Sequence, residues 1–146
     1  MKLLLTLLLS TIITGKSQWL TDMGAARTEA SQTHKYILLN FSGSDWCGPC
    51  IRMHKEVFDS EAFVNYASDK LILVNADFPR LRKNQLSKEQ TKMNEALADQ
   101  YNPGGKFPFT VLLDQNGKIL QSWEGFPNFT PEQFIDQVNN VVHAVN

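Results

Sequence analysis

The chain has 146 residues, of which 42% are hydrophobic and 20% charged, and 14 basic against 15 acidic residues give a formal net charge of −1. This length fits a single domain that buries a core of its own. The mild acidity argues against a nucleic-acid partner, for which a basic stripe is expected, and the presence of only two cysteines, both in one C-x-x-C, excludes a disulfide-rich secreted scaffold.

The first 17 residues have the pattern of a secretory signal peptide. A short positive start at Lys2 precedes a mostly apolar run over residues 3–13, which is shorter than the roughly 20 residues that a membrane-spanning helix needs. Cleavage after Ser17 would leave residues 18–146, without a stable membrane anchor, and removal of two lysines would take the net charge from −1 to −3. The alternative for this stretch is an ordinary N-terminal helix.

In the first half of the remaining chain, apolar runs and cap residues predict two strands and three helical segments. A helix over 23–33 follows the cap residue Asp22, and YILLNF (36–41) is a buried strand. Helical spacing follows over 51–58, and again after a cap at Asp59 or Ser60. LILVNAD (71–77) is a second buried strand.

The second half predicts a helix, a hairpin and a last helix. Ser87 and Gln90 form a capping box for a helix that ends before NPGG (102–105). FTVLLDQNGKILQSW (109–123) predicts two strands joined by a type I′ turn at Asn116-Gly117. Thr130 and the following proline open the last helix. The order α-β-α-α-β-α-β-β-α predicts an α/β fold with a central mixed sheet and helices on both faces.

The cysteine pair, Cys47 and Cys50, allows a zinc, haem, structural or redox interpretation. A zinc site commonly needs four ligands, and the three histidines show no paired spacing with the cysteines: His34, His54 and His143. Ile51 stands where a c-type haem motif requires histidine. A structural disulfide would close too small a loop to add much stability. The redox interpretation is therefore favoured, and no metal site is predicted.

The elements around the pair supply a redox mechanism. A strand, a short loop and a helix place Cys47 at a helix N-terminus, where free N–H groups favour a thiolate. Gly48-Pro49 fits the first helical turn, because proline loses no hydrogen bond there. Cys50 then lies on the same helix face, within reach of a mixed disulfide on Cys47.

WCGPC (46–50) is identical to the active-site motif of thioredoxins, and from about Trp19 onward the chain resembles the thioredoxin superfamily. The element order and a proline just before the hairpin, Pro108, support the resemblance. It implies a thioredoxin fold in which a cis Pro108 faces the cysteines and the Phe107 backbone binds a substrate peptide.

The resemblance also implies which residues form the site. Cys47 and Cys50 are the expected catalytic residues and redox-active disulfide. The expected substrate-binding residues are Trp46, Gly48, Pro49, Phe107 and Pro108. Trp46 and Phe107 would form an apolar lip for an extended peptide, and no cofactor besides the dithiol is expected.

Departures from thioredoxins are visible as well, among them an apolar residue near Leu73 in place of a lysine. Asn40 stands where thioredoxins carry a buried aspartate, Lys55 replaces the proline that kinks the active-site helix, and the loop before Cys47 is one residue longer. The pattern is more similar to exported relatives, including the C-terminal domains of bacterial thiol:disulfide interchange proteins. Asp45 is either a replacement general base or a solvated loop carboxylate, and Glu56 is either buried near Cys50 or on the surface.

The sequence thus predicts an exported thiol–disulfide oxidoreductase that reduces protein disulfides, in the periplasm or, as a second choice, secreted. Its partners would be disulfide-containing proteins or peptides and a membrane redox protein that recycles the dithiol. The alternative is a peptide-binding or chaperone-like module on the same fold, with secondary redox activity.

Overall fold

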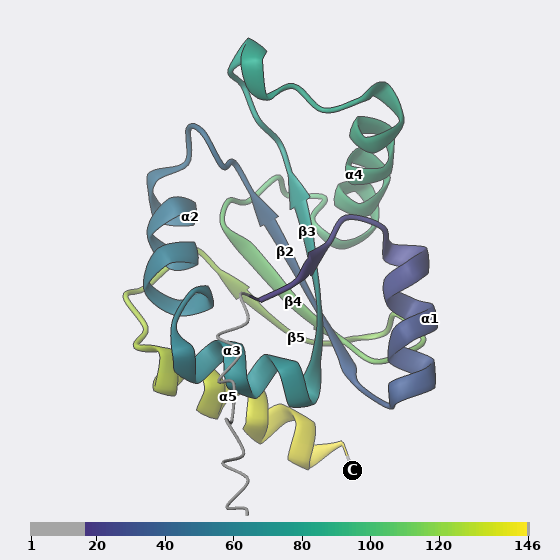
Figure 1. Ribbon diagram of the computed structural model, residues 1–146, viewed down its shortest axis with the longest axis vertical. Helices are drawn as coiled ribbons and strands as arrows, with labels where there is room; N and C mark the ends of the chain where they lie inside the picture. Colours follow the sequence, from purple (N-terminus) through teal and green to yellow (C-terminus); the bar gives the residue numbers. More distant parts are fainter. Residues whose placement is uncertain (1–16, 146) are drawn as a thin grey trace, which may run out of the picture.

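The computed structural model of the protein describes residues 17–145, so the predicted signal peptide lies, apart from Ser17, outside the described residues. Five strands form one sheet in the order β1-β3-β2-β4-β5 (Figure 1). They are β1 (Trp19–Leu20), β2 (Tyr36–Ser42), β3 (Leu71–Asp77), β4 (Phe109–Leu113) and β5 (Ile119–Glu124). β3 is parallel to β1 and β2, whereas β4 is antiparallel to both β2 and β5.

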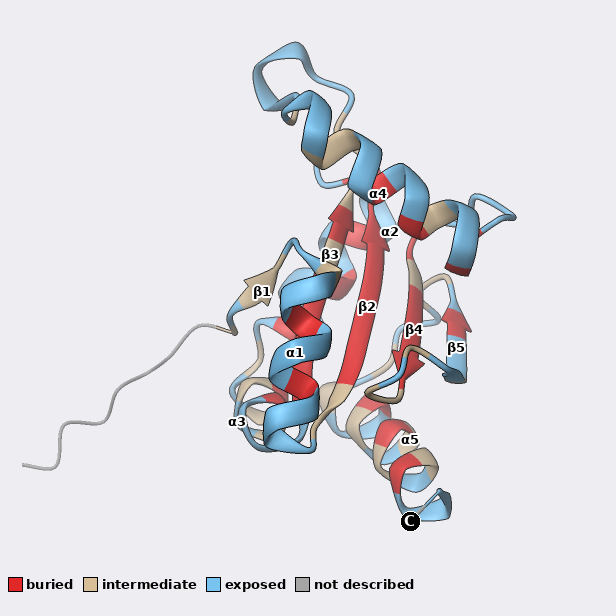
Figure 2. Ribbon diagram, turned by 90° about the vertical axis from the view of Figure 1, so that its right-hand side faces the viewer, coloured by how far each residue is buried: buried red, intermediate tan, exposed pale blue. Residues whose placement is uncertain are grey.

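Helices cover both faces of the sheet, with α1 and α4 on one face and α2, α3 and α5 on the other (Figures 1 and 2). The helical segments are α1 (Met23–Thr33), α2 (Gly48–Met53), η1 (His54–Phe58), α3 (Glu61–Lys70), η2 (Arg82–Asn84), α4 (Lys88–Tyr101) and α5 (Pro131–Ala144). This architecture confirms the predicted α/β class, the thioredoxin fold and the mixed sheet between two helical layers. Within residues 17–145, no helix combines the length and the apolar character needed to cross a membrane.

The central strand β2 contributes side chains to both halves of the core. Leu38 points into a cluster that includes Phe58 and Phe134, while Ile37 and Leu39 point into the cluster on the α1 and α4 side. All three are fully buried. A strand covered on both faces needs apolar side chains on both, and this explains the nearly continuous apolar run of residues 36–41.

Cap residues set the helix starts much as their chemistry predicts. The Asp22 carboxylate accepts a hydrogen bond from the Ala25 N–H, and Ser60, one of the two predicted caps, begins α3. Thr130 forms the complete predicted capping box of α5.

The capping box predicted for α4 is only half present. Ser87 caps the helix, but the Gln90 side-chain amide donates to the Thr21 carbonyl and to Asn94 in place of the expected reciprocal bond.

The β4–β5 hairpin is present, but its predicted type I′ turn is wrong. A type I′ turn needs positive φ at both central residues, and of the pair Asn116-Gly117 only Gly117 has one, at 84°. The Asp114 carboxylate accepts hydrogen bonds from the N–H groups of Asn116 and Lys118. This local bonding holds a longer connection in which only the glycine is left-handed.

The active-site helix continues without a proline kink. Where thioredoxins carry that proline, Lys55 lies inside a π-helical segment, η1, in which the Asp59 N–H donates to the His54 carbonyl five residues earlier. The wider turn lets Val57 and Phe58 both reach the core, where they are buried. The two-residue strand β1 also lay outside the sequence prediction, because so short a segment has no period to detect.

Candidate active site

A disulfide joins Cys47 and Cys50 where β2 leads into α2. The S–S distance is 2.06 Å, and the two residues are only 5% and 4% exposed. Cys47 is the N-cap of α2, and its sulfur accepts a hydrogen bond from the Cys50 N–H at 3.3 Å. The intervening Gly48 and Pro49 are exposed, so they form the surface over which another molecule can approach the sulfurs.

The Trp46 side chain is fixed on three sides. Its indole N–H donates to the Phe78 carbonyl at 2.7 Å, and its ring meets Phe107 edge-on at 5.4 Å between centroids. The guanidinium carbon of Arg80 lies 3.7 Å from the centre of the Trp46 ring, a cation–π contact. Behind it, a Cβ added at Gly43 would lie 2.2 Å from the ring, so only glycine leaves room for this tryptophan.

Asp45 fastens the active-site loop to the segment that follows β3. Its carboxylate accepts hydrogen bonds from the N–H groups of Arg80 and Leu81, both at 2.9 Å, and from the Asn84 amide at 3.0 Å. The Arg80 bond first, then those from Asn84 and Leu81, lowers the pKa of the Asp45 carboxyl below its usual 3.8, against the opposing effect of desolvation. Asp45 is thus a partly exposed loop carboxylate that hydrogen bonds hold in place, which agrees better with the second sequence interpretation than with a general base.

The loop before β4 brings an aromatic residue to the same place. The Phe107–Pro108 peptide bond is cis, Pro108 is buried, and its carbonyl accepts a hydrogen bond from the Gly125 N–H. The Phe107 ring lies against Trp46 and, at 5.5 Å, against Phe78. The structure therefore brings the two predicted lip residues together, and Phe78 is a third aromatic that the sequence did not single out.

A chain of polar side chains crosses the sheet from the position of Asn40. Asn40 is 3% exposed. Its side-chain oxygen accepts a hydrogen bond from the Thr110 hydroxyl, and its side-chain nitrogen donates to the Asn75 side-chain oxygen. Ser42 donates to Asn75 and Asp77. A neutral amide, hydrogen-bonded through both its oxygen and its nitrogen, thus occupies the position where thioredoxins carry their aspartate.

The remaining predicted candidates lie outside this constellation. Glu56 is about half exposed and pairs with Arg52, so it is not buried near Cys50. His54 is also about half exposed and lies 3.4 Å from Asp59. Among the described residues, no group of three or more histidines, cysteines and carboxylates is placed to hold a metal ion.

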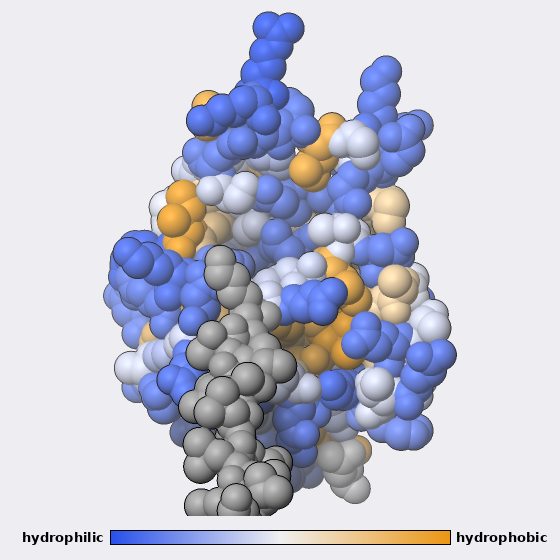
Figure 3. Space-filling view, viewed as in Figure 1, coloured by the Kyte–Doolittle hydropathy of each residue, from blue (hydrophilic) through white to orange (hydrophobic). Residues whose placement is uncertain are grey.

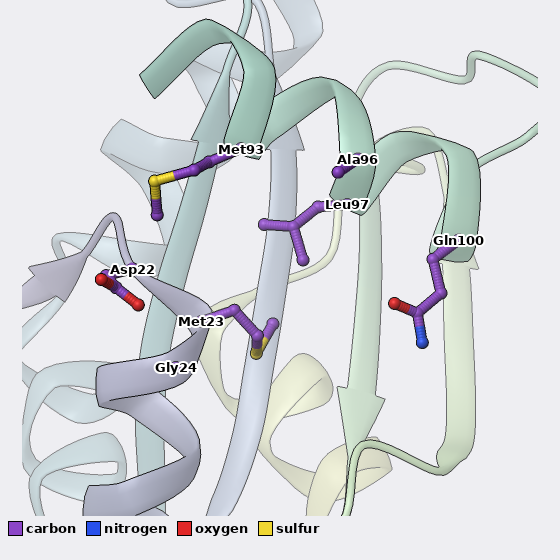
Figure 4. Close-up of a pocket in the computed structure, with 7 residues that line it drawn as sticks. All are labelled: Asp22, Met23, Gly24, Met93, Ala96, Leu97 and Gln100. Atoms are coloured by element: carbon purple, nitrogen blue, oxygen red, sulfur yellow. The ribbon is translucent and has the colours of Figure 1, made fainter. Parts of the chain in front are cut away.

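A shallow hollow of about 210 Å³ lies between α1 and α4, with Met23 and Leu97 projecting into it (Figure 4). Neither cysteine lines it. The hollow is therefore separate from the disulfide, and the candidate active site is the shallow surface formed by Trp46, Gly48, Pro49 and Phe107.

Both the sequence and the structure match known proteins. Residues 23–141 match the family of thioredoxin-like domains. Over 103 residues the chain is 40% identical to a Chlamydia pneumoniae protein, disulfide bond reductase DsbH, in a match that covers 70% of this chain and 60% of that protein. The chain therefore spans about three fifths of the length of this curated relative.

Solved structures show the same similarity. A DsbH oxidoreductase superposes with a TM-score of 0.81 at 32% identity, with 98% of this chain and 94% of that chain covered. The oxidised C-terminal domain of DsbD from Neisseria meningitidis superposes with a TM-score of 0.57 at 18% identity, with 81% and 90% covered. The second similarity shows the fold alone.

Proposed function

The chain belongs to the family of thioredoxin-like domains, and on that premise we propose that it is an exported thiol–disulfide oxidoreductase that reduces disulfide bonds in other proteins. The observation that carries the proposal is the Cys47–Cys50 disulfide at the start of α2, beside an exposed surface. The relative named disulfide bond reductase supports the direction of the reaction.

In the reduced protein, Cys47 is the nucleophile. In the disulfide form the Cys50 N–H donates to its sulfur. After reduction such a bond at a helix start favours the thiolate. The thiolate attacks one sulfur of a substrate disulfide, that S–S bond breaks, and the other substrate sulfur leaves and takes up a proton. Cys50 loses its proton and attacks the Cys47 sulfur, which frees the first substrate sulfur to be protonated. Two electrons and two protons pass to the substrate, and the Cys47–Cys50 disulfide remains.

The substrate binds as an extended segment over the surface between the two active-site loops. Trp46 and Phe107, whose rings contact one another, together supply one apolar surface. Gly48 and Pro49 leave the sulfurs open to approach, and Pro108 shapes the loop that carries Phe107. The exposed position of Gly48 and Pro49 and the 5.4 Å contact between the two rings support this assignment.

Two further features complete the proposal. The pattern of residues 1–17 supports export, with the periplasm as the compartment. A dithiol oxidised at each turnover must be reduced again, so a membrane redox protein is the expected electron donor.

Substitution of each cysteine tests the proposal. Cys50→Ser should trap substrates as mixed disulfides on Cys47, because the resolving thiol is gone, and Cys47→Ser should abolish insulin reduction. Full biological function in a Cys47→Ser strain would instead favour the peptide-binding module. The redox equilibrium with glutathione gives the direction. We expect a potential near the thioredoxin value of about −270 mV, and a value above about −180 mV would contradict a reductase.

A further inference from the structure

A strongly basic segment leaves the sheet beside the disulfide. Residues 78–88, here called the basic segment, connect β3 to the start of α4. They contain four of the chain's 14 basic residues and no acidic residue, although the whole chain has a net charge of −1. Such a concentration of one sign of charge beside a reaction site favours partners of the opposite sign.

The structure attaches this segment firmly to the active-site loop. Asp45 accepts hydrogen bonds from the Arg80 and Leu81 N–H groups and from the Asn84 side chain. The Trp46 indole N–H donates to the Phe78 carbonyl, and Arg80 stacks on the Trp46 ring. Trp46 directly precedes Cys47, so the segment is bound to the loop that carries the nucleophile, and it cannot move far without breaking these contacts.

The charges of the basic segment are open to solvent. Arg80, Arg82 and Lys83 are exposed, and Leu81 between them is 48% exposed. The segment forms the tip that projects past the end of the sheet in Figure 1, and that end is mostly hydrophilic in Figure 3. An exposed leucine among basic side chains gives a surface for both the backbone and the acidic side chains of a bound segment.

Two acidic side chains near the start of the segment are already engaged in hydrogen bonds. Asp45 is bonded to the basic segment itself. Asp77 accepts hydrogen bonds from Ser42, from Ser44 and from the Phe78 N–H. With Asp45, Asp77 and Glu89, which directly follows the segment, all counted, the four basic residues still leave the region with a net charge of +1.

We propose that the basic segment is a docking surface that selects substrate proteins with acidic residues beside the disulfide to be reduced. This inference rests on the proposed reductase function and adds the class of substrate. Arg82 and Lys83 attract the acidic side chains, Leu81 contacts the substrate chain, and Arg80 stacks on Trp46, the residue before Cys47.

Two synthetic peptides test the proposal, each with one internal disulfide in the same ring sequence, flanked by glutamates in one and by lysines in the other. We expect the full-length protein to reduce the acidic peptide about tenfold faster at low ionic strength, as electrostatic steering of association allows. The ratio should approach one in about 0.5 M salt, where the screening length falls well below 10 Å.

A matched pair of charge reversals locates the effect. Arg82→Glu should lower the ratio of the acidic to the basic peptide rate severalfold. Lys118→Glu makes the same charge change at an exposed site in the β4–β5 connection, at the opposite end of the sheet, since Leu113 pairs with Ile37 at the start of β2. It should leave the ratio unchanged.

The possible outcomes distinguish failure of the docking proposal from failure of the proposed reductase function. Equal reduction of both peptides, unaffected by Arg82→Glu, would contradict the docking role of the basic segment but would leave the proposed reductase function unchanged. Failure to reduce either peptide would overturn both. Equal peptide rates combined with binding to phosphatidylglycerol vesicles that Arg82→Glu abolishes would assign the segment to a membrane surface and also overturn the proposal.

Discussion

At the residue scale, Asn40 is the position where a neutral amide replaces a titrating group. It is 3% exposed, and its amide donates to the Asn75 side-chain oxygen at 3.1 Å. Asn40→Asp would put a carboxylate oxygen against that acceptor, and burial would raise its pKa above the unfolded value of about 3.9. We expect the oxidised protein to lose about 1–3 kcal/mol of unfolding free energy at pH 7.

The pH dependence follows from the sign of that shift. A carboxyl whose pKa is raised by folding destabilises the fold fully above its folded pKa and not at all below its unfolded pKa. Urea unfolding of Asn40→Asp should therefore show a smaller loss at pH 4.5 than at pH 7. Asn65→Asp, at an exposed position of α3, is the control and should show little loss at either pH. Equal losses for Asn40→Asp at the two values would contradict a buried carboxylate.

Gly43 is the second residue whose chemistry decides the site. Its Cβ position lies 2.2 to 2.5 Å from three atoms of the Trp46 ring, so Gly43→Ala must displace the tryptophan from Phe107 and Arg80. Displacement of a positioning group by about 1 Å can cost up to about a hundredfold in rate. We expect a loss of insulin reduction between severalfold and this limit, measured as an initial rate.

The control for Gly43→Ala is Gly104→Ala. A Cβ at Gly104 would meet only the flexible Lys106 side chain, at 3.4 Å, so this variant should keep the wild-type rate. Near-ultraviolet circular dichroism would report the altered tryptophan environment in Gly43→Ala alone. An unchanged rate together with an altered spectrum would show that Trp46 does not position substrate.

At the element scale, the contact between the active-site loop and the segment after β3 depends on the charge of Asp45. Folding lowers the pKa of this carboxyl, so its stabilising effect is complete above the usual 3.8 and is lost as the pH falls through the lower folded value. Hydrogen exchange of the Arg80 and Leu81 N–H groups, corrected for intrinsic rates, should lose protection over that acidic range.

Asp45→Asn should reproduce this loss at neutral pH, because an amide offers one acceptor oxygen in place of two. Asp69→Asn removes a carboxylate whose side chain is 74% exposed, and it should leave the Arg80 and Leu81 N–H groups protected. If Asp45→Asn left their protection unchanged, Asp45 would not be what holds the segment in place.

The same elements show where sequence reasoning succeeds. Caps at Asp22, Ser60 and Thr130 and the apolar strands 36–41 and 71–77 are local signals, so helix starts and the core strands could be predicted. The order of these elements along the chain was sufficient to predict a mixed sheet with helices on both faces.

Contacts between distant segments could not be predicted in this way. Asp45 bonds to residues 35 to 39 positions away, and a lone carboxylate in a loop gives no sign of such partners. Arg80 and Phe78 were missed for the same reason. The unusual charge of residues 78–88 was a readable signal, but only the contacts with Asp45 and Trp46 place it beside the disulfide. The π-helical turn at Lys55 depends on the packing of Val57 and Phe58, which a single helical period does not describe.

At the scale of the whole molecule, the potential of the disulfide is tied to the stability of the fold. A protein that reduces others must favour its own disulfide when folded, whereas a strong oxidant is one whose reduced form is stabilised. The thioredoxin and DsbA potentials, about −270 and −120 mV, differ by about 7 kcal/mol for two electrons, at about 1.4 kcal/mol for each 30 mV. A reductase and an oxidant therefore differ in which form of the protein, oxidised or reduced, is the more stable, and ordinary unfolding experiments can distinguish the two cases.

We expect the oxidised protein to unfold at a higher urea concentration than the reduced protein, because a reductase favours its own disulfide, here Cys47–Cys50, in the folded state. Unfolding curves with and without excess dithiol give the two midpoints. The variant with both Cys47→Ser and Cys50→Ser is the control, and its midpoint should not respond to the dithiol. A reduced form more stable than the oxidised one would contradict the reductase direction, since reduced WCGPC would then be the favoured state and the protein would act as an oxidant.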